Sequence, residues 1–332
     1  MATGTILTPD YVVPEEEPSR DGRTAESYEE LLARLSHQSV VKHFDAYADV
    51  PWDDPEYRID PDDPRWEAVV GDELGGTAWY QAQPATVRSR IGLHMAATFM
   101  KIGVQFESVL KRGLLAYAAT LPNGSPELRY LYHETIEEAH HSLMFQEFVN
   151  RTGLDIPGLA WRERFFAKRV IRHATRFPAL FFVFVLGGED PIDHVQRSAL
   201  RSGRPLPPIL KRIMQIHVTE EARHLCFARH YLRQRVPTLG VVSRTVLALG
   251  APLILGQMAQ LMMRPSPEIV RTYGIPRAVV AEAYTRNPRH RAETLAALRK
   301  VRDLCRELGI VTRPARVLWE VLGLWETQPA PA

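Results

Sequence analysis

Glu-x-x-His motifs are the residues of this sequence best suited to bind a metal ion. In a helix this spacing places a carboxylate and an imidazole one turn apart on the same face, so both can reach one cation. The motif alone is weak evidence, because chance can produce it in a chain rich in Glu and His. Three such pairs occur: Glu137/His140, Glu138/His141 and Glu221/His224.

Helical periodicity distinguishes the two overlapping motifs. Glu138 and His141 share a stripe with apolar residues such as Phe145, so we expect them to face the core. Glu137 and His140 belong to a neighbouring, more polar stripe, which we expect to face solvent. One turn before Glu138 lies Glu134, which is either a hydrogen-bond partner of a metal ligand or an acid exposed to solvent.

The later motif lies on a second amphipathic pattern. His217, Glu221 and His224 share its apolar stripe, which places three possible ligands on two successive turns. We expect Glu220 to lie outside this stripe and to pair with Arg223.

Each of these helices follows another that carries an acid in apolar surroundings. An unpaired carboxylate is costly to bury, so Glu107 and Glu189 each need a cation, a proton or an arginine. Glu107 precedes Glu138 by 31 residues, and Glu189 precedes Glu221 by 32. One Glu from each of two helices and Glu-x-x-His from each of two others is the pattern of carboxylate-bridged dinuclear sites in ferritin-like bundles. These ligands suit iron or manganese better than zinc.

The chain resembles the AurF-type diiron N-oxygenases, the family of p-aminobenzoate N-oxygenase, over roughly residues 85–310. His217, four residues before Glu221, is the discriminating mark, because acyl-carrier desaturases and ribonucleotide reductase small subunits use two Glu-x-x-His motifs without it. The resemblance is carried by Glu107, Glu138-Ala-His-His141-Ser, Glu189 and His217-Val-Thr-Glu-Glu221-Ala-Arg-His224.

The resemblance implies a centre of two iron ions, with a mixed manganese and iron centre as the alternative. This centre would itself be the catalyst, and it would use O2 to oxidise a small aromatic amine through hydroxylamine and nitroso stages to a nitro group. Two other functions stay open: a diiron hydroxylase or desaturase acting on carbon, and a ferritin-like metal-binding protein without turnover. The implied metal ligands are Glu107, Glu138, His141, Glu189, His217, Glu221 and His224.

The expected partners follow from this chemistry. Besides the amine and O2, the resemblance implies an external electron donor of the ferredoxin or flavin reductase type, and a homodimer. The basic, aromatic-rich stretch 162–176 is expected to be a solvated helix face, with docking of an acidic protein as the alternative and no nucleic acid.

No alternating strand pattern or glycine-rich phosphate loop is present, so the sequence predicts an all-α fold. Long helices favour a ferritin-like bundle with a four-helix diiron core and additional helices. Pro191 is expected to distort the helix beside Glu189. The expected helices cover residues 25–37, 86–121, 125–152, 159–175, 178–200, 207–235, 239–263, 276–286 and 289–309.

Composition divides the chain. Residues 1–75, with 19 acids and 6 bases, predict an acidic, partly irregular arm, in which residues 44–73 would act as a lid or a dimer strap. Residues 76–326 are the expected oxygenase domain, and 327–332 the expected disordered tail. The two cysteines form no disulfide framework, and the start lacks a signal-peptide pattern, so we expect a cytoplasmic protein. The uncharged stretch 245–263 is expected to be a core helix without membrane contact.

Overall fold

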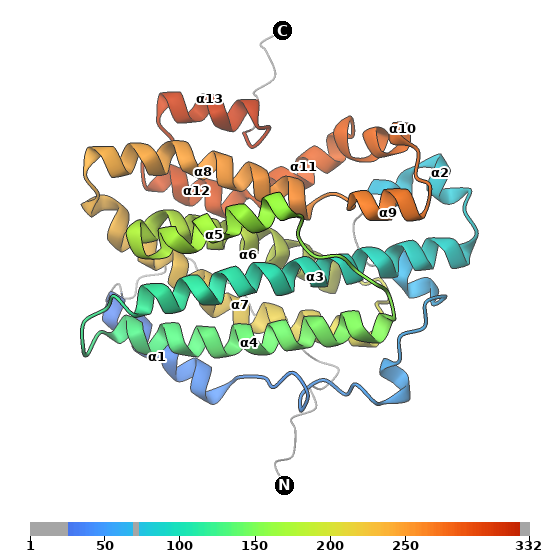
Figure 1. The fold of residues 1–332 in the computed structure, drawn as a ribbon, viewed down its shortest axis with the longest axis horizontal. Coiled ribbons are helices and arrows are strands. Elements are labelled where there is room, and N and C mark those ends of the chain that lie inside the picture. The colour runs from blue at the N-terminus through green and yellow to red at the C-terminus, as the bar shows by residue number, and fades with distance from the viewer. Residues whose placement is uncertain (1–25, 69–72, 326–332) are drawn as a thin grey trace.

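The computed structural model describes residues 26–68 and 73–325, and it confirms the all-α prediction: these residues form helices and no strand. Four long helices form a bundle in which α3 packs on α4 and α6 packs on α7 (Figure 1). Contacts between α4 and α7, and between α3 and α6, join the two pairs. The bundle helices are α3 (Ala85–Ala118), α4 (Pro126–Thr152), α6 (Pro178–Arg201) and α7 (Pro208–Arg235).

Further helices surround this bundle. On one side α1 (Tyr28–Val41) packs on α4 and α7, and on another α5 (Trp161–Arg176) packs on α3 and α6. The carboxyl-terminal helices cover several parts of the molecule: three pack on α6, and the rest contact α3 or neighbouring carboxyl-terminal elements (Figure 1). They are α8 (Val241–Met262), α9 (Pro267–Thr272), α10 (Arg277–Val280), α11 (Pro288–Ala297), α12 (Arg299–Glu307) and α13 (Arg313–Val321), and a short α2 (Ala78–Gln81) precedes the bundle.

The helix ends follow local chemistry. Ser27 caps α1 in a capping box with Glu30, in which each side chain bonds the other residue's amide. Pro126 begins α4 at a position where its missing N–H costs nothing. Gly153 ends the same helix with a φ of 69°, a left-handed conformation that favours glycine. The predicted ends of this helix are therefore confirmed.

The helical predictions are less accurate after residue 263, whereas the predicted helix 239–263 agrees with α8. The predicted helix 289–309 is two helices that meet at the buried Leu298, and 276–286 is α10 followed by the π-helical turn Ala281–Thr285. Neither α9 nor α13 was expected. These elements are short, and packing on the bundle determines their ends more than propensity does.

Pro191 lies inside α6 without interrupting it. Proline removes one main-chain hydrogen bond and normally breaks a helix. The whole stretch 179–193 is buried, however, and α6 contacts the surrounding α5, α7, α8, α11 and α12. Packing on every side therefore maintains the helix through the proline, and Glu189 stays in helical register.

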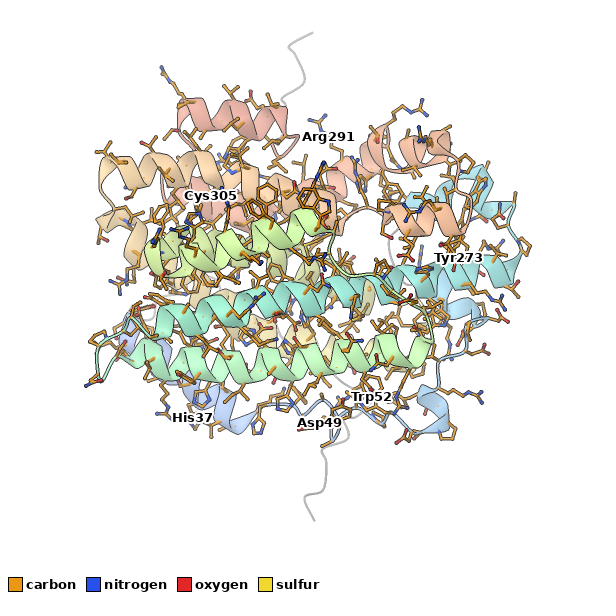
Figure 2. All side chains as sticks on the ribbon, viewed as in Figure 1. His37, Asp49, Trp52, Tyr273, Arg291 and Cys305 are labelled. Carbon is orange, nitrogen blue, oxygen red and sulfur yellow. The ribbon has the colours of Figure 1, made fainter. Side chains whose placement is uncertain are left out.

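Residues 44–68 of the acidic arm lie along the bundle, below α4 in Figure 1, and include Asp49 and Trp52, which Figure 2 labels. Phe44, Trp52 and Trp66 are buried in one apolar cluster with residues of α3, α4 and α7. Ion pairs at the edge, such as Arg88 with Glu67 at 2.7 Å, add contacts between the arm and α3. The arm thus covers the bundle of its own chain; its role as a lid or dimer strap, and a boundary at residue 75, remain predictions. The predicted tail 327–332 lies outside the described residues.

One helical stretch of the described residues, Val241–Thr272, is long and apolar enough to span a membrane, and 50% of its most apolar window is buried in the molecule. Within it, α8 packs on α6 and α13. This packing favours the predicted core helix over a membrane span.

Close packing of α3 and α6 generates a testable prediction. A Cβ at Gly188 would overlap the ring of the buried Phe106, next to Glu107. We expect Gly188→Ala to lower the free energy of unfolding by roughly 1–3 kcal/mol through overpacking, although alanine is the better helix former. Denaturant unfolding measures this change. The control Gly76→Ala, at an exposed position where no atom lies within 4 Å of the new Cβ, should be nearly neutral; equal stability of both variants would contradict the close packing.

Candidate metal centre

The structure brings all seven sequence-predicted residues into one buried cluster, and each of these side chains is at most 1% exposed. They come from all four bundle helices. Within the cluster, three sets of possible ligand atoms each lie within 4.8 Å of one another. The sets are Glu107, His141 and His217; Glu138, Glu221 and His224; and Glu189, His217 and Glu221.

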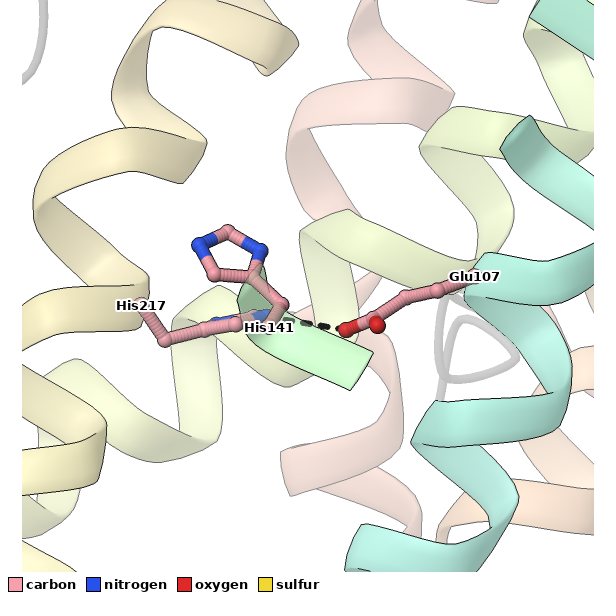
Figure 3. Close-up of side chains that lie close together, drawn as sticks. All are labelled: Glu107, His141 and His217. Carbon is pink, nitrogen blue, oxygen red and sulfur yellow. Dashed lines mark ion pairs between the residues drawn. The ribbon is translucent and has the colours of Figure 1, made fainter. Parts of the chain in front are cut away.

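The first set joins three helices, as Figure 3 shows for Glu107 on α3, His141 on α4 and His217 on α7. The two imidazole rings lie 4.8 Å apart between centroids. His217 Nε2 lies 4.0 Å from Glu107 Oε1, too far for a direct hydrogen bond. The three side chains therefore lie close enough together to bind one cation.

The two carboxylates of the second set lie beside two histidines, His224 of the same set and His141 of the first. His224 Nδ1 lies 2.9 Å from Glu138 Oε1 and 3.1 Å from Glu221 Oε1. His141 Nδ1 lies 3.5 Å from an oxygen of each of the same two glutamates. Both histidines thus direct Nδ1 toward Glu138 and Glu221, and these carboxylates lie at the centre of the cluster.

Unpaired polar atoms concentrate here. Among the described residues, neither oxygen of Glu189 has a hydrogen-bond partner, and the same is true of Glu107 Oε1, Glu138 Oε2, Glu221 Oε2 and His141 Nδ1. Leaving so many buried acceptors unsatisfied costs several kcal/mol. Cations would satisfy them, and oxygen-rich ligands with imidazoles are a donor set that suits iron or manganese. The residues therefore fit a dinuclear metal centre.

Electrostatics lead to the same conclusion. Burial, together with repulsion from Glu138, raises the pKa of Glu107 to about 8. Burial likewise raises the pKa of Glu189 well above its usual value, with added repulsion from Glu221. Burial alone would also raise the pKa of Glu138, but the adjacent His141 and His224 lower it instead. Without metal, some of these carboxylates must hold protons, which cations would displace.

Of two expectations about neighbouring glutamates, the one for Glu137 is wrong, and the pairing of Glu220 with Arg223 is confirmed but accompanied by a closer contact. Glu137 is buried instead of solvated: it accepts a hydrogen bond from Arg223 at 2.8 Å and lies 2.8 Å from His224 Nε2. Glu220 is also buried and lies 2.8 Å from His141 Nε2, although its predicted neighbour Arg223 is within 3.6 Å. The repeat of Glu-Glu-x-x-His in the two helices is the sequence pattern that could have indicated a shared role for Glu137 and Glu220.

Other singled-out residues lie outside the cluster. Glu134 is buried, and burial raises its pKa to about 8, so exposure to solvent was the wrong alternative. His140 is half-buried and accepts a hydrogen bond from the main-chain N–H of Ala46. His94 packs against Tyr273, and His230 Nδ1 donates to the Cys226 carbonyl.

Comparisons with known proteins agree with this geometry. Residues 25–309 match the family described as P-aminobenzoate N-oxygenase AurF. The chain is also 42% identical over 294 residues to uncharacterized proteins of Mycobacterium tuberculosis (strain CDC 1551 / Oshkosh) and Mycobacterium bovis (strain ATCC BAA-935 / AF2122/97), which covers 89% of this chain and 86% of each relative. No solved structure matches significantly.

The buried cluster predicts an unusual pH dependence of the metal-free protein. Glu107 and Glu134 have pKa values raised to about 8 in the folded state, against about 4.5 when unfolded. Burial alone would lower the pKa of His141 and of His224, but their carboxylate neighbours raise both well above the usual value. Between pH 7 and 8 the folded state therefore binds more protons than the unfolded state, so stability falls as pH rises.

We expect the free energy of unfolding of the metal-free protein to fall by on the order of 2 kcal/mol over this interval. Iron-loaded protein, whose ligands exchange protons for metal, should change less. Anaerobic thermal unfolding with and without a chelator measures the difference. A metal-free protein that becomes more stable from pH 7 to 8 would contradict the assignment of these buried protons.

Proposed function

This chain belongs to the AurF family of p-aminobenzoate N-oxygenases, and on that premise we propose that it is an O2-dependent diiron oxygenase that oxidises the nitrogen of a small aromatic amine. The family has the ferritin-like, all-α fold of this chain. The observation that carries the proposal is the convergence of four glutamates and three histidines, all buried, inside the bundle.

The proposed ligands of two iron ions are the seven predicted residues. Glu138 and Glu221 lie between His141 and His224 and would supply carboxylate oxygens at the middle of the site. Glu138 Oε2 and both oxygens of Glu189 support the inclusion of these residues, because they have no hydrogen-bond partner in the described part of the chain. A site with one manganese and one iron would use the same donors.

The bound iron would supply the redox chemistry with O2. The protein holds its ligands in place from four rigid helices and excludes bulk water, since none of the seven is more than 1% exposed. Phe145 contributes an apolar wall: its ring lies 5.2 Å from that of His217 and 6.3 Å from that of His141. Such a dry environment strengthens the electrostatic interactions that the reacting groups experience.

Turnover also needs electrons from outside. We propose a donor of the ferredoxin or flavin reductase type, because no second redox group is implied by the sequence. The exposed face of α5 offers six Arg and Lys with the exposed Trp161, Phe165 and Phe166, which suits either solvent or an acidic protein. A cytoplasmic homodimer is part of the same proposal.

Metal content tests the centre itself. We expect about two irons per chain after anaerobic loading, as the dinuclear ligand pattern requires. Glu138→Ala and His224→Ala should each lose most of this iron, because both residues lie at the centre of the cluster. The control His230→Ala removes a helical histidine outside the cluster and should retain it. Metal analysis with an ultraviolet-visible spectrum measures the outcome; both irons retained in the first two variants would refute the ligand assignment.

Reaction with O2 tests the activity. Reduced protein mixed with O2 should give a transient visible absorption that an arylamine consumes faster, with an oxidised-nitrogen product seen by mass spectrometry. Slow oxidation that no substrate accelerates would support a non-catalytic metal-binding protein instead. Acceleration by aliphatic compounds but not by arylamines would support a hydroxylase or desaturase acting on carbon.

A further inference from the structure

Glu137 and Glu220 directly precede the predicted ligands Glu138 and Glu221, and each contacts a histidine on the other helix of the α4–α7 pair. Glu137 on α4 lies 2.8 Å from Nε2 of His224 on α7. Glu220 on α7 lies 2.8 Å from Nε2 of His141 on α4. All four side chains are at most 2% exposed. In each Glu-Glu-x-x-His motif, the second glutamate thus belongs to the metal-ligand cluster. The first contacts the motif histidine of the other helix.

This exchange fixes which ring nitrogen carries hydrogen. A carboxylate only accepts hydrogen bonds, so Nε2 of each histidine must donate and keep its hydrogen. A metal ion can then displace only the hydrogen on Nδ1 and bind the lone pair of that nitrogen. Both Nδ1 atoms face Glu138 and Glu221. We propose that Glu137 and Glu220 are positioning residues that hold His224 and His141 in the tautomer and orientation able to bind metal. This inference rests on the proposed diiron function.

Different groups hold the two glutamates. Arg223 donates to Glu137 at 2.8 Å, so a side chain of α7 fixes this carboxylate. Glu220 instead accepts the main-chain N–H of Phe44, in the acidic arm, at 3.0 Å, while Arg223 is 3.6 Å away. A residue 176 positions earlier in the chain therefore completes the hydrogen bonds around His141.

The arm segment around Phe44 is itself held in place. The Arg212 guanidinium lies over the Phe44 ring at 5.6 Å, and Arg212 Nε donates to the Asp49 carbonyl at 2.8 Å. Trp52 Nε1 donates to the Ala46 carbonyl at 2.7 Å. These contacts fix the amide of Phe44 against Glu220. The arm is consequently part of the hydrogen-bond network around His141.

Glutamine variants test the exchange. The Glu220→Gln side chain has two possible orientations. If its oxygen accepts from His141 Nε2–H, its NH2 group opposes the Phe44 N–H, and two donors face each other. If the amide is flipped, its NH2 group donates to His141 Nε2, and the hydrogen of the neutral imidazole must then be on Nδ1. Either arrangement should lower the affinity for one of the two iron ions by about 10–100-fold. Glu137→Gln should do the same through His224. Anaerobic equilibrium titration with Fe(II) measures both affinities, and Glu147→Gln, on the same helix but paired with Arg151, is the matched control.

A spectroscopic readout separates positioning from simple loss of packing. In Zn(II)-loaded protein with 15N-labelled histidine, NMR should show His141 and His224 as Nε2–H tautomers. Glu220→Gln should change the His141 signals and Glu137→Gln those of His224, each with little effect on the other. If every variant has a lowered affinity for both iron ions and also loses helicity, the variants are misfolded. That outcome would overturn the proposal that each glutamate positions one particular histidine.

The role of the arm has its own test. Phe44→Pro removes the amide hydrogen and should lower the affinity for one iron ion, as Glu220→Gln does. The NMR signals of His141 should change, and those of His224 should stay as in the wild type. Phe44→Ala keeps the amide and should have a smaller effect. If wild-type protein binds no pair of irons, the proposed function fails. If it binds two and the Glu220, Glu137 and Phe44 variants match it in affinity and tautomer, the positioning inference fails.

Discussion

Confinement of negative charge determines the organisation of this molecule. Four glutamates project into the interior of a helical bundle, where ionised carboxylates are unstable without compensating charge. The fold meets this constraint by bringing histidines to the same place and by leaving several carboxylate oxygens free of protein partners. Long, tightly packed helices then hold these groups together, even where Pro191 removes a main-chain hydrogen bond beside Glu189.

The interior of the bundle could be predicted from the sequence because helical periodicity is strong there. Glu138, His141 and Glu221 occupy stripes that only one packing arrangement buries, and the paired intervals connect them with Glu107 and Glu189. Glu137 and Glu220 were misplaced for a physical reason. A periodicity argument assumes one buried face for each helix, whereas α4 and α7 are covered on a second face by α1 and the arm.

The periphery was harder to predict for the same reason. Short helices such as α11 and α12 have little intrinsic stability, so contacts with α6 determine where they begin and end. The path of the arm depends on single long-range contacts, such as Arg212 with the Asp49 carbonyl, that leave no periodic pattern. Acidic composition alone indicated an irregular segment, and only the folded chain shows that it reaches Glu220, which contacts His141.

Contact through the peptide backbone has an evolutionary consequence. The hydrogen that Phe44 offers to Glu220 belongs to the main chain, and every residue type except proline possesses it. Substitutions in this part of the arm are therefore tolerated as far as this bond is concerned, whereas insertions or deletions that shift its course are not. Among relatives, we expect spacing rather than residue identity to be under selection here.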